Sequence, residues 1–453
     1  MSSDLMPPKG WIVSDAQSYC TKIADGTHDS PKQSAIGNLL VTSKNIIDGE
    51  LDLSKSYFIS EEDYSKINRR SKVDKNDVLL SMIGTVGQAC VVEQEPNFAI
   101  KNVGLLKNDD PIKAKWLYFY LSSPKAQQLI KERLKGTTQQ YLSLGEIRKL
   151  PVFYPESHDV MKRVVYFLDS LRKKIIINNS VSRTLEQMAQ ALFKSWFVDF
   201  DPVKAKMAVL DAGGSQADAT LAAMSAISGK DTDALEVFKR EHPEQYAELK
   251  ATAELFPSAM QDSELGDIPE GWYLQRFSNI ATLHYGKALK KTERIEGPYS
   301  VYGSGGITGS HNSYLVEGPG IIVGRKGSIG TLYWEDGKFH PIDTVYYVEN
   351  KEGVPLTYLY YLMGTLNLSS MNTDAAVPGL NRDNVYRLET INPEIAILNE
   401  FNNHVSALRN MIQRNKSSTE TLTQLRDTLL PKLLSGEITL PEAEQAVSEA
   451  ENV

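Results

Sequence analysis

The sequence has few cysteines and no long apolar run. Only two of its 453 residues, Cys20 and Cys90, are cysteines, which are too few for a disulfide framework and lack metal-site spacing. We expect both to be small buried side chains in a reducing compartment. No stretch approaches the roughly 18 apolar residues of a membrane span, and no apolar signal segment opens the chain. We therefore expect a cytoplasmic protein without a membrane partner.

Catalytic motifs are missing as well. There is no Gly-x-x-x-x-Gly-Lys-Ser/Thr phosphate loop and no Asn/Asp-Pro-Pro-Tyr/Phe tetrad of an amino-methyltransferase. The seven histidines form no cluster with ligand spacing, and no carboxylate–lysine set indicates a nuclease. The segment beginning at Gly303 lacks the context of a dinucleotide site. We expect no catalytic residue, no metal and no cofactor in this chain.

The formal charge of −8 is unevenly distributed. Residues 205–271 carry 13 acidic and 5 basic side chains, and residues 435–453 carry five glutamates and no basic residue. The remainder of the chain is therefore slightly basic. An acidic total does not exclude nucleic acid as a ligand, because the remaining parts can present local basic faces.

The main positive feature is an internal repeat. Pro-Lys-Gly-Trp at Pro8–Trp11 recurs as Pro-Glu-Gly-Trp at Pro269–Trp272. A strand pattern that enters a glycine turn over residues 77–87 recurs over residues 320–330. A repeat of such long period indicates that the whole architecture is built from two similar parts. We therefore predict two similar β-rich modules, with the turn residues aligned as Gly84 with Gly327, Thr85 with Ser328, and Gly87 with Gly330.

Each module is followed by a heptad pattern. Apolar residues recur at alternating steps of three and four over residues 168–196 and again over 405–433, which is typical of a coiled coil. An amphipathic helix lying on its own module is the alternative. Asn178 and Asn415, which fall in the middle of each pattern, favour a helix pair with a fixed register. The predicted pairing residues are Leu171, Ile175, Asn178, Leu185, Leu192, Leu408, Ile412, Asn415, Leu422 and Leu429.

The paired helices would act as a ruler. A helix over residues 159–195 is about 55 Å long at 1.5 Å per residue, and an antiparallel pair would place the modules at opposite ends. Residues 205–265 would bring the chain back, with a short helix around residues 234–249 and little core of their own. Pro431 interrupts the second pattern, so we expect that helix to bend or end there.

The predicted fold class is α+β, with two similar domains of twisted β-sheet and helices. Two long helices that form an antiparallel coiled coil would join them. The predicted boundaries are 1–157 for the first domain, 158–204 for the first long helix, 205–268 for an acidic connector, 269–395 for the second domain, 396–436 for the second long helix, and 437–453 for an acidic tail.

Polar, glycine-rich loops supply the candidate binding residues. Arg325 and Lys326 stand at a strand-to-turn tip, where Arg or Lys can pair with guanine O6 and N7. The first module has Met82 and Ile83 at the matching tip, so the two modules would recognise different sequences. A solvated charged loop is the alternative at each position. The candidates for DNA contact are Thr27, His28, Lys32, Lys72, Ser81, Gly84, Thr85, Gly87, Gln139, Gln140 and Tyr141, and in the second module His284, Lys287, Lys290, Tyr302, Ser304, Gly305, Arg325, Lys326, Gly327 and Ser328.

A basic segment of the first module offers further phosphate contacts. It contains Lys66, Arg69, Arg70, Lys72 and Lys75. The exposed end of a charged helix explains these residues equally well.

Several longer motifs stand out along the chain. They are Ser195-Trp-Phe-Val-Asp-Phe-Asp-Pro-Val-Lys-Ala-Lys, Asp262-Ser-Glu-Leu-Gly-Asp-Ile-Pro-Glu-Gly-Trp, Tyr302-Gly-Ser-Gly-Gly-Ile, Val377-Pro-Gly-Leu-Asn-Arg and Leu429-Leu-Pro-Lys-Leu-Leu-Ser-Gly-Glu-Ile. In their order and residues these motifs are similar to signatures of the specificity subunits of type I restriction–modification systems, and the resemblance covers nearly the whole chain. The first module departs most, because it lacks a Tyr-Gly-Ser-Gly-Gly segment.

The resemblance implies a mechanism. Each module would be a target-recognition domain in the major groove of double-stranded DNA, at one half of a bipartite, asymmetric site. The chain would hold two methyltransferase subunits, which bind S-adenosylmethionine and methylate adenine at N6. Two motor–nuclease subunits, which use ATP and Mg, would join for cleavage. This chain would itself be non-catalytic. A two-headed coiled-coil adaptor for proteins or glycans is the competing hypothesis.

Overall fold

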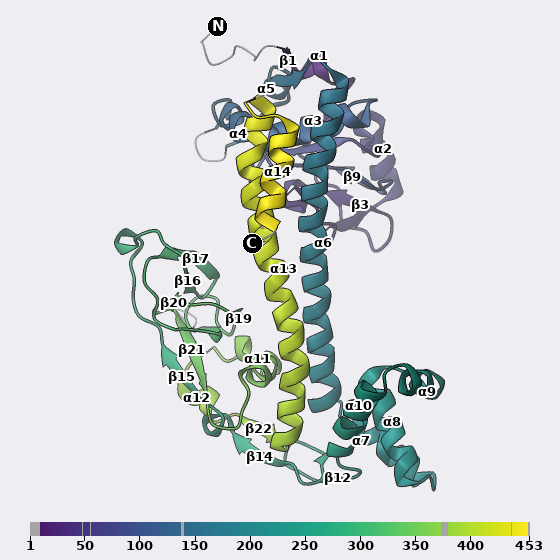
Figure 1. Ribbon diagram of the computed structural model, residues 1–453. Coiled ribbons are helices and arrows are strands. Elements are labelled where there is room, and N and C mark those ends of the chain that lie inside the picture. Colours follow the sequence, from purple (N-terminus) through teal and green to yellow (C-terminus); the bar gives the residue numbers. More distant parts are fainter. Residues whose placement is uncertain are drawn as a thin grey trace. The chain divides into compact units, whose positions relative to one another are not determined.

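The computed structural model describes residues 10–47, 49–54, 56–136, 140–372, 379–435 and 437–451 (Figure 1). Its contacts divide the chain into two units. Unit 1 contains Met1–Asn179 and Ser417–Val453, and unit 2 contains Ser180–Lys416. Each unit therefore combines one of the two modules with part of each long helix.

The main sheets of the two units have the same topology. Each has four antiparallel strands, in which the strand that comes last in the chain lies second in the sheet. In unit 1 the order is β2 (Lys22–Asp25), β10 (Val103–Lys107), β7 (Val78–Ser81) and β8 (Ala89–Val91). In unit 2 it is β15 (Ala281–Tyr285), β21 (Val345–Asn350), β18 (Gly320–Gly324) and β19 (Leu332–Glu335). The predicted repeat is confirmed.

A second, three-stranded sheet is also repeated. Its central strand is antiparallel to one neighbour and parallel to the other. In unit 1 the order is β6 (Tyr57–Ile59), β3 (Asn38–Val41) and β9 (Phe98–Ile100), and in unit 2 it is β17 (Gly306–His311), β16 (Tyr299–Gly303) and β20 (Phe339–Pro341). Two-stranded pairs complete the modules, β1 (Trp11–Asp15) with β11 (Pro151–Pro155) and β14 (Tyr273–Arg276) with β22 (Glu389–Asn392). The structure has the predicted α+β class.

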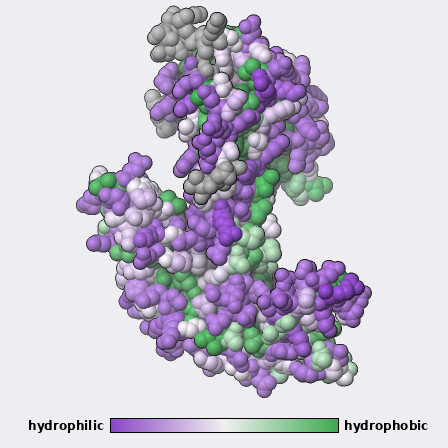
Figure 2. All heavy atoms as spheres, viewed as in Figure 1, coloured by the Kyte–Doolittle hydropathy of each residue, from purple (hydrophilic) through white to green (hydrophobic). Residues whose placement is uncertain are grey.

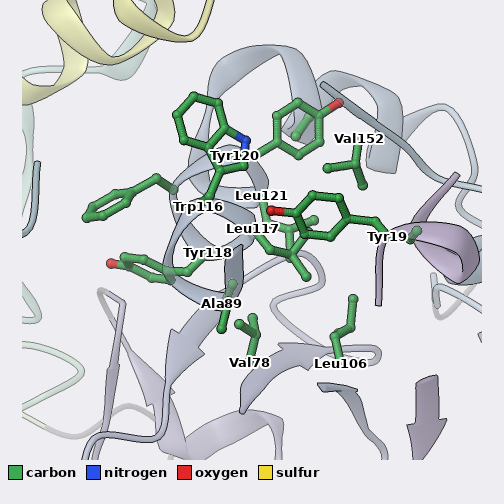
Figure 3. Close-up of a cluster of buried hydrophobic side chains, with 14 of the residues drawn as sticks. Tyr19, Val78, Ala89, Leu106, Trp116, Leu117, Tyr118, Tyr120, Leu121 and Val152 are labelled. Carbon is green, nitrogen blue, oxygen red and sulfur yellow. The ribbon is translucent and has the colours of Figure 1, made fainter. Parts of the chain in front are cut away.

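One helix of each module forms the centre of its core. In unit 1 this is α3 (Pro111–Ser122), which is apolar on most sides and therefore buried. Figure 3 shows Trp116, Leu117 and Leu121 among residues of the sheet and of β11. The indole N–H of Trp116 donates to the carbonyl of Phe153 over 2.9 Å, so its polar edge is also satisfied. The equivalent helix in unit 2 is α11 (Leu356–Thr365).

The two long helices are α6 (His158–Phe197) and α13 (Ile395–Ser435). In unit 1 the Asn178 amide donates to the Ser418 hydroxyl over 3.1 Å, and in unit 2 Arg409 forms an ion pair with Glu186 over 2.9 Å. Residue numbers fall along α13 as they rise along α6, so the helices are antiparallel, as predicted. Of the ten predicted pairing residues, Leu171, Leu185, Leu422 and Leu429 are buried and the others are partly buried.

The helix α13 does not end at Pro431, which lies inside it. The proline removes one backbone hydrogen bond. Apolar side chains on both sides of it, Leu429 and Leu430 before and Leu433 and Leu434 after, are buried in the core of unit 1. Their burial holds the last turns in helical form, which is why the expectation of a helix end there was wrong.

The acidic connector is more ordered than predicted. It forms four helices, and the single helix expected over residues 234–249 is divided at His242, because Pro243 cannot continue α9 and instead begins α10. A small hydrophobic cluster fills the space between them, which corrects the expectation of little core. The helices are α7 (Asp201–Asp211), α8 (Gln216–Ser228), α9 (Thr232–Glu241) and α10 (Pro243–Leu255), and the cluster contains Ala223, Met224, Leu235 and Ala253.

The remaining fold-level predictions concern burial and membranes. Cys20 and Cys90 are both buried, and burial raises the pKa of each thiol to about 12. In the part of the chain that the structure describes, no helix has the length and apolar character needed to span a bilayer.

The tail contains a helix, α14 (Leu440–Glu451), whose Ala443 is buried in the core of unit 1.

The surface is mainly hydrophilic, as Figure 2 shows for one face. Hydrophobic side chains are nevertheless exposed along α6. Tyr166, Ile177, Val181 and Met188 are between 39% and 59% exposed. Their spacing places them on one side of α6, where Val181 and Met188, four residues before Leu185 and Leu192, border the face that pairs with α13.

Candidate functional site

The glycine turn that follows β7 in unit 1 and β18 in unit 2 has the same structure in both. The Gly87 N–H donates to the carbonyl of Ser81 over 3.0 Å, and the Gly330 N–H donates to the carbonyl of Gly324 over 2.8 Å. At the tip, Gly84 and Gly327 have φ values of 78° and 81°. This left-handed conformation suits glycine and strains other residues, which explains why both glycines stand there.

A second loop lies beside each turn. The Leu142 N–H donates to the carbonyl of Met82, and the Leu380 N–H donates to the carbonyl of Arg325, both over 2.9 Å. Backbone bridges connect Ile83 with Tyr141 and Lys326 with Gly379. The loops lead into α5 (Leu144–Arg148) and α12 (Arg382–Tyr386). The structure therefore brings two chain segments together at one tip in each module.

This pairing places the glutamine-rich loop of the first module. Tyr141 is 41% exposed and lies beside the glycine turn, where the exposed Gly84 and Thr85 also stand. Gln140 is exposed next to it. Gln139 lies outside the described residues.

A third segment joins the turn in unit 2. The turn between β16 and β17 contains Ser304 and Gly305, and the Ser304 carbonyl accepts hydrogen bonds from the Thr331 hydroxyl over 2.7 Å and the Tyr333 hydroxyl over 3.2 Å. A side-chain carbon added at Gly327 would lie 3.3 Å from the Ser304 hydroxyl. The predicted contact residues of this tip, Ser304, Gly305, Arg325, Lys326, Gly327 and Ser328, are therefore neighbours.

Two arginines and a tyrosine gather beside this tip. The guanidinium carbons of Arg325 and Arg382 each lie 5.2 Å from the centre of the Tyr285 ring. The Arg325 side chain also donates from Nε to the carbonyl of Asp343 over 3.1 Å. Tyr285 is 52% exposed at the end of β15. We name Tyr285, Arg325 and Arg382 the Arg–Tyr–Arg cluster. Only Arg325 was predicted, although Arg382 closes the Val377–Arg382 motif quoted above.

A buried tyrosine supports the Arg–Tyr–Arg cluster. Tyr346 pairs with Tyr285 across neighbouring strands, and its hydroxyl donates to the carbonyl of Leu380 over 3.0 Å. Burial, followed by its hydrogen bond to Tyr285, raises the pKa of Tyr346 to about 12. The hydroxyl therefore stays neutral and holds the loop before α12 against the sheet.

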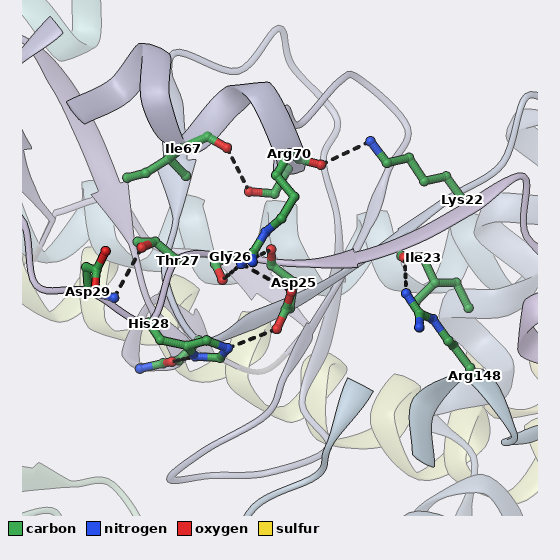
Figure 4. Close-up of polar contacts among 12 residues, drawn as sticks. Lys22, Ile23, Asp25, Gly26, Thr27, His28, Asp29, Ile67, Arg70 and Arg148 are labelled. Carbon is green, nitrogen blue, oxygen red and sulfur yellow. Dashed lines mark hydrogen bonds and ion pairs between the residues drawn. The ribbon is translucent and has the colours of Figure 1, made fainter. Parts of the chain in front are cut away.

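The first module has a basic hollow at the end of β2. Its volume is about 650 Å³, and it is lined by Thr27, His28, Asp29, Ser30, Pro31, Lys32, Asp63, Lys66, Ile67, Arg70 and Ser71. Figure 4 shows how Asp25 organises it. Asp25 contacts His28 over 3.1 Å and Arg70 over 3.3 Å, and Arg70 also donates to the Gly26 carbonyl over 2.8 Å. The predicted residues Thr27, His28 and Lys32 thus share one site with Lys66 and Arg70.

Three predicted contact residues are buried. Ser81 is fully buried, and its hydroxyl accepts from the Gln88 N–H over 3.0 Å and donates to the Thr85 carbonyl. Tyr302 is 4% exposed, and its hydroxyl donates to Glu335 over 2.8 Å. Gly87 is buried below the turn. These positions argue against direct contact with DNA, and we reassign the three residues as supports of the turns.

The other predicted basic residues have contacts with residues outside the turn tips. Lys72 forms an ion pair with Asp74 over 3.0 Å, and His284 contacts Glu349 over 2.7 Å. His284 also stacks on Tyr347 at 5.0 Å between ring centres. Lys287 and Lys290 are exposed on the loop after β15, with Lys290 3.8 Å from Glu293.

Comparison with known proteins agrees with this architecture. The family model described as "Type I restriction modification DNA specificity domain" matches residues 36–187 and again residues 269–427, which together make up more than half of the chain. The chain belongs to this family, and the suspected resemblance is confirmed. The two matches correspond to the two copies of the repeat.

Individual relatives are similar over most of the chain. It is 28% identical over 406 residues to the type I restriction enzyme HindI specificity subunit of Haemophilus influenzae, which covers 82% of this chain and 88% of that one. It is 21% identical to the MjaIX specificity subunit of Methanocaldococcus jannaschii, covering 81% and 79%. The crystal structure of the S subunit from M. genitalium has a TM-score of 0.54 at 16% identity and covers 96% of this chain and 99% of that one, which shows a similar fold.

Proposed function

We propose that this chain is the DNA-specificity subunit of a type I restriction–modification complex and recognises a bipartite, asymmetric DNA site. One observation carries the proposal. The same backbone turn occurs in both modules, with Met82 and Ile83 at one tip and Arg325 and Lys326 at the other. A shared scaffold with different tips suits two similar domains that recognise two different half-sites.

The tips offer groups that suit the major groove. Each projects a turn and a neighbouring loop, which is a compact element of the size that the groove admits. Tyr141 and Gln140 in the first module and Lys326 in the second are exposed there, and Ser328 is partly exposed. Amide, hydroxyl and cationic groups at such tips can pair with base edges, which carry the sequence information.

The basic hollow of unit 1 is suited to a DNA phosphate. His28, Lys32, Lys66 and Arg70 line it, against two carboxylates, Asp29 and Asp63. Arg70 is held by Asp25 and by the Gly26 carbonyl, so part of the entropy cost of fixing its side chain is met before DNA binds. Phosphate contacts position a protein on DNA without reporting the sequence.

The two long helices would set the distance between half-sites. Their antiparallel pairing and polar contacts, such as the one between Asn178 and Ser418, fix a single register. Half-sites on one face of the duplex are about one helical turn apart. A rigid spacer of constant length would then require a constant number of base pairs between the two half-sites.

Catalysis would lie in partner subunits. Two methyltransferase subunits, which bind S-adenosylmethionine and methylate adenine at N6, would dock on the long helices and the connector. Two motor–nuclease subunits that use ATP and Mg would join them for cleavage. The exposed apolar residues of α6, including Ile177 and Met188, support a protein partner on that helix.

The experiment that tests the proposal is a salt series on duplex binding by this chain assembled with its methyltransferase subunit. Counterion release predicts that the logarithm of the affinity falls linearly with the logarithm of the salt concentration. A flat response, or no DNA binding by the assembled complex, would contradict the proposal and favour an adaptor for proteins or glycans.

A further inference from the structure

The Arg–Tyr–Arg cluster of unit 2 adds two guanidinium groups and a tyrosine ring to the donors of the turn tip. We propose that Arg325 and Arg382, oriented by Tyr285, recognise guanine in the half-site read by the second module. The inference rests on the proposed function and adds the class of base that one module selects.

Both guanidinium groups lie against one aromatic ring, without a carboxylate partner among the described residues. Both lie 5.2 Å from the Tyr285 ring, and Arg382 is also 5.7 Å from the Tyr386 ring. Within the described ranges neither arginine forms an ion pair with a side chain. Two like charges on one aromatic ring repel each other, and cation–π attraction offsets only part of that repulsion. The arrangement therefore favours a ligand that is rich in acceptor atoms.

Among the described residues, both guanidinium groups keep donors that make no hydrogen bond, and the Nε of Arg382 is buried without a partner. Arg325 uses Nε and one N–H of Nη2 on the Asp343 carbonyl, and its Nη1 donates to no described residue. Arg382 donates from Nη1 to the Leu283 carbonyl at 3.5 Å, a long contact that a better acceptor can replace. A guanidinium edge with two parallel N–H groups matches the O6 and N7 acceptors of guanine.

A comparison between the modules favours a base over a phosphate. The Gly26 N–H donates to the Val103 carbonyl over 2.9 Å, and the Gly286 N–H donates to the Val345 carbonyl over 3.2 Å. These equivalent bonds align Asp25 with Tyr285. The paired turns and loops align Met82 with Arg325 and Leu144 with Arg382. None of the three cluster residues is therefore repeated in the first module.

This difference between the modules favours a contact to a base over a contact to a phosphate. A contact to phosphate carries no sequence information, so it can be alike in both copies or differ between them without changing the recognised sequence. A base contact must differ between them if the half-sites differ. The presence of the Arg–Tyr–Arg cluster in one copy alone, built on a backbone that the two copies share, is what sequence recognition requires.

Tyr285 is a positioning residue in this proposal. Its ring is the surface shared by both arginines, and Tyr346 beneath it fixes the ring from the neighbouring strand. Removing the ring should release both side chains at once, whereas removing only its hydroxyl should not.

The test uses the complete complex of this chain with its methyltransferase subunit, on a DNA library in which each base of the target is varied. The variants are Arg382→Ala, Arg382→Lys, Tyr285→Leu and Tyr285→Phe, with Arg276→Ala as the control because Arg276 is an exposed arginine on β14 of the same unit. Methylation is mapped at single-base resolution, and the salt dependence of binding is measured beside it.

Guanine recognition predicts loss of discrimination at one or two guanines of one half-site, by roughly 10- to 100-fold, for Arg382→Ala and Tyr285→Leu. Arg382→Lys keeps the charge but loses the planar edge, so it should also relax the sequence while the salt dependence stays unchanged. Arg276→Ala should keep the wild-type pattern, and Tyr285→Phe, which retains the ring, should relax the sequence less than Tyr285→Leu.

A uniform loss of affinity with a smaller salt slope, rescued by Arg382→Lys, would show a phosphate contact and overturn the inference. An unchanged methylation pattern in Arg382→Ala would overturn it as well. If the wild-type complex itself shows no sequence-specific methylation, the proposed function fails, and that result is distinct from either outcome for the variants.

Discussion

At the scale of single residues, the glycines at the turn tips are the clearest link between sequence and structure. Gly327 has a φ of 81°, a conformation that costs other residues roughly 1–2 kcal/mol. Its contact with the Ser304 hydroxyl leaves little room for a side chain. Glycine at residue 327 therefore lets the tip form, with Arg325 and Lys326 beside it, without this cost.

We expect Gly327→Ala to lower the free energy of unfolding by about 1–2 kcal/mol, through backbone strain. Gly364→Ala is the matched control, since Gly364 lies in α11 with open space around it and no left-handed φ. Alanine there should be neutral or stabilising by up to about 1 kcal/mol. Denaturant unfolding of both variants gives the comparison, and equal effects would show that the tip is not strained.

A second prediction at this scale concerns the basic hollow of unit 1. Arg70→Ala should weaken binding to all DNA sequences alike and reduce the salt slope by about one unit, because a phosphate contact reports no sequence. Arg69→Ala is the control, since Arg69 is an exposed neighbour that does not line the hollow. A change of the recognised sequence in Arg70→Ala would instead assign the hollow to a base.

At the scale of elements, the pairing of α6 with α13 depends on a few polar contacts. Arg409 is 8% exposed, pairs with Glu186 over 2.9 Å and lies 4.5 Å above the Trp334 ring. Because Glu186 is itself largely shielded, removal of the arginine leaves a carboxylate without its cation.

Arg409→Ala should therefore destabilise the fold by about 3 kcal/mol. Arg414→Ala, at an exposed position of the same helix, should have an effect within about 0.5 kcal/mol. The midpoints of thermal unfolding of the two variants measure this difference in stability. Equal midpoints would mean that the pair contributes nothing to helix docking.

The elements also show what can be predicted from sequence. The heptad pattern identified both long helices, because an apolar spacing of three and four residues selects one face for burial. The helix end expected at Pro431 was wrong, because the burial of Leu429 and Leu433 compensates for the one backbone hydrogen bond that the proline removes. We expected too few helices in the connector. Their small alanine-rich core, which includes Ala223 and Ala253, gives a weak hydrophobic signal in the sequence.

The candidate site was predicted less completely. The turn residues were found because glycine at a left-handed position leaves a recognisable signal. Ser81 and Tyr302 are polar in sequence but bond inside the fold. Tyr285 and Arg382 are nearly 100 positions apart in the chain, and only the folded structure brings them to one place.

At the scale of the whole molecule, the proposed ruler can be shortened. The antiparallel register places residues 179–185 of α6 opposite residues 411–417 of α13, since Asn178 contacts Ser418 and Glu186 contacts Arg409. Deletion of both segments removes one heptad, about 10.5 Å, and keeps the flanking pairs in register. The spacer between half-sites should shorten by about three base pairs. An unchanged spacer would show that the helices do not set it.

The central claim is that one chain with two copies of a scaffold recognises two different half-sites. Its most direct test is to map methylated adenines in DNA exposed to the assembled methyltransferase. The account predicts an asymmetric site of two short specific parts separated by a constant number of unspecified base pairs. A single continuous site, or two identical half-sites, would contradict it.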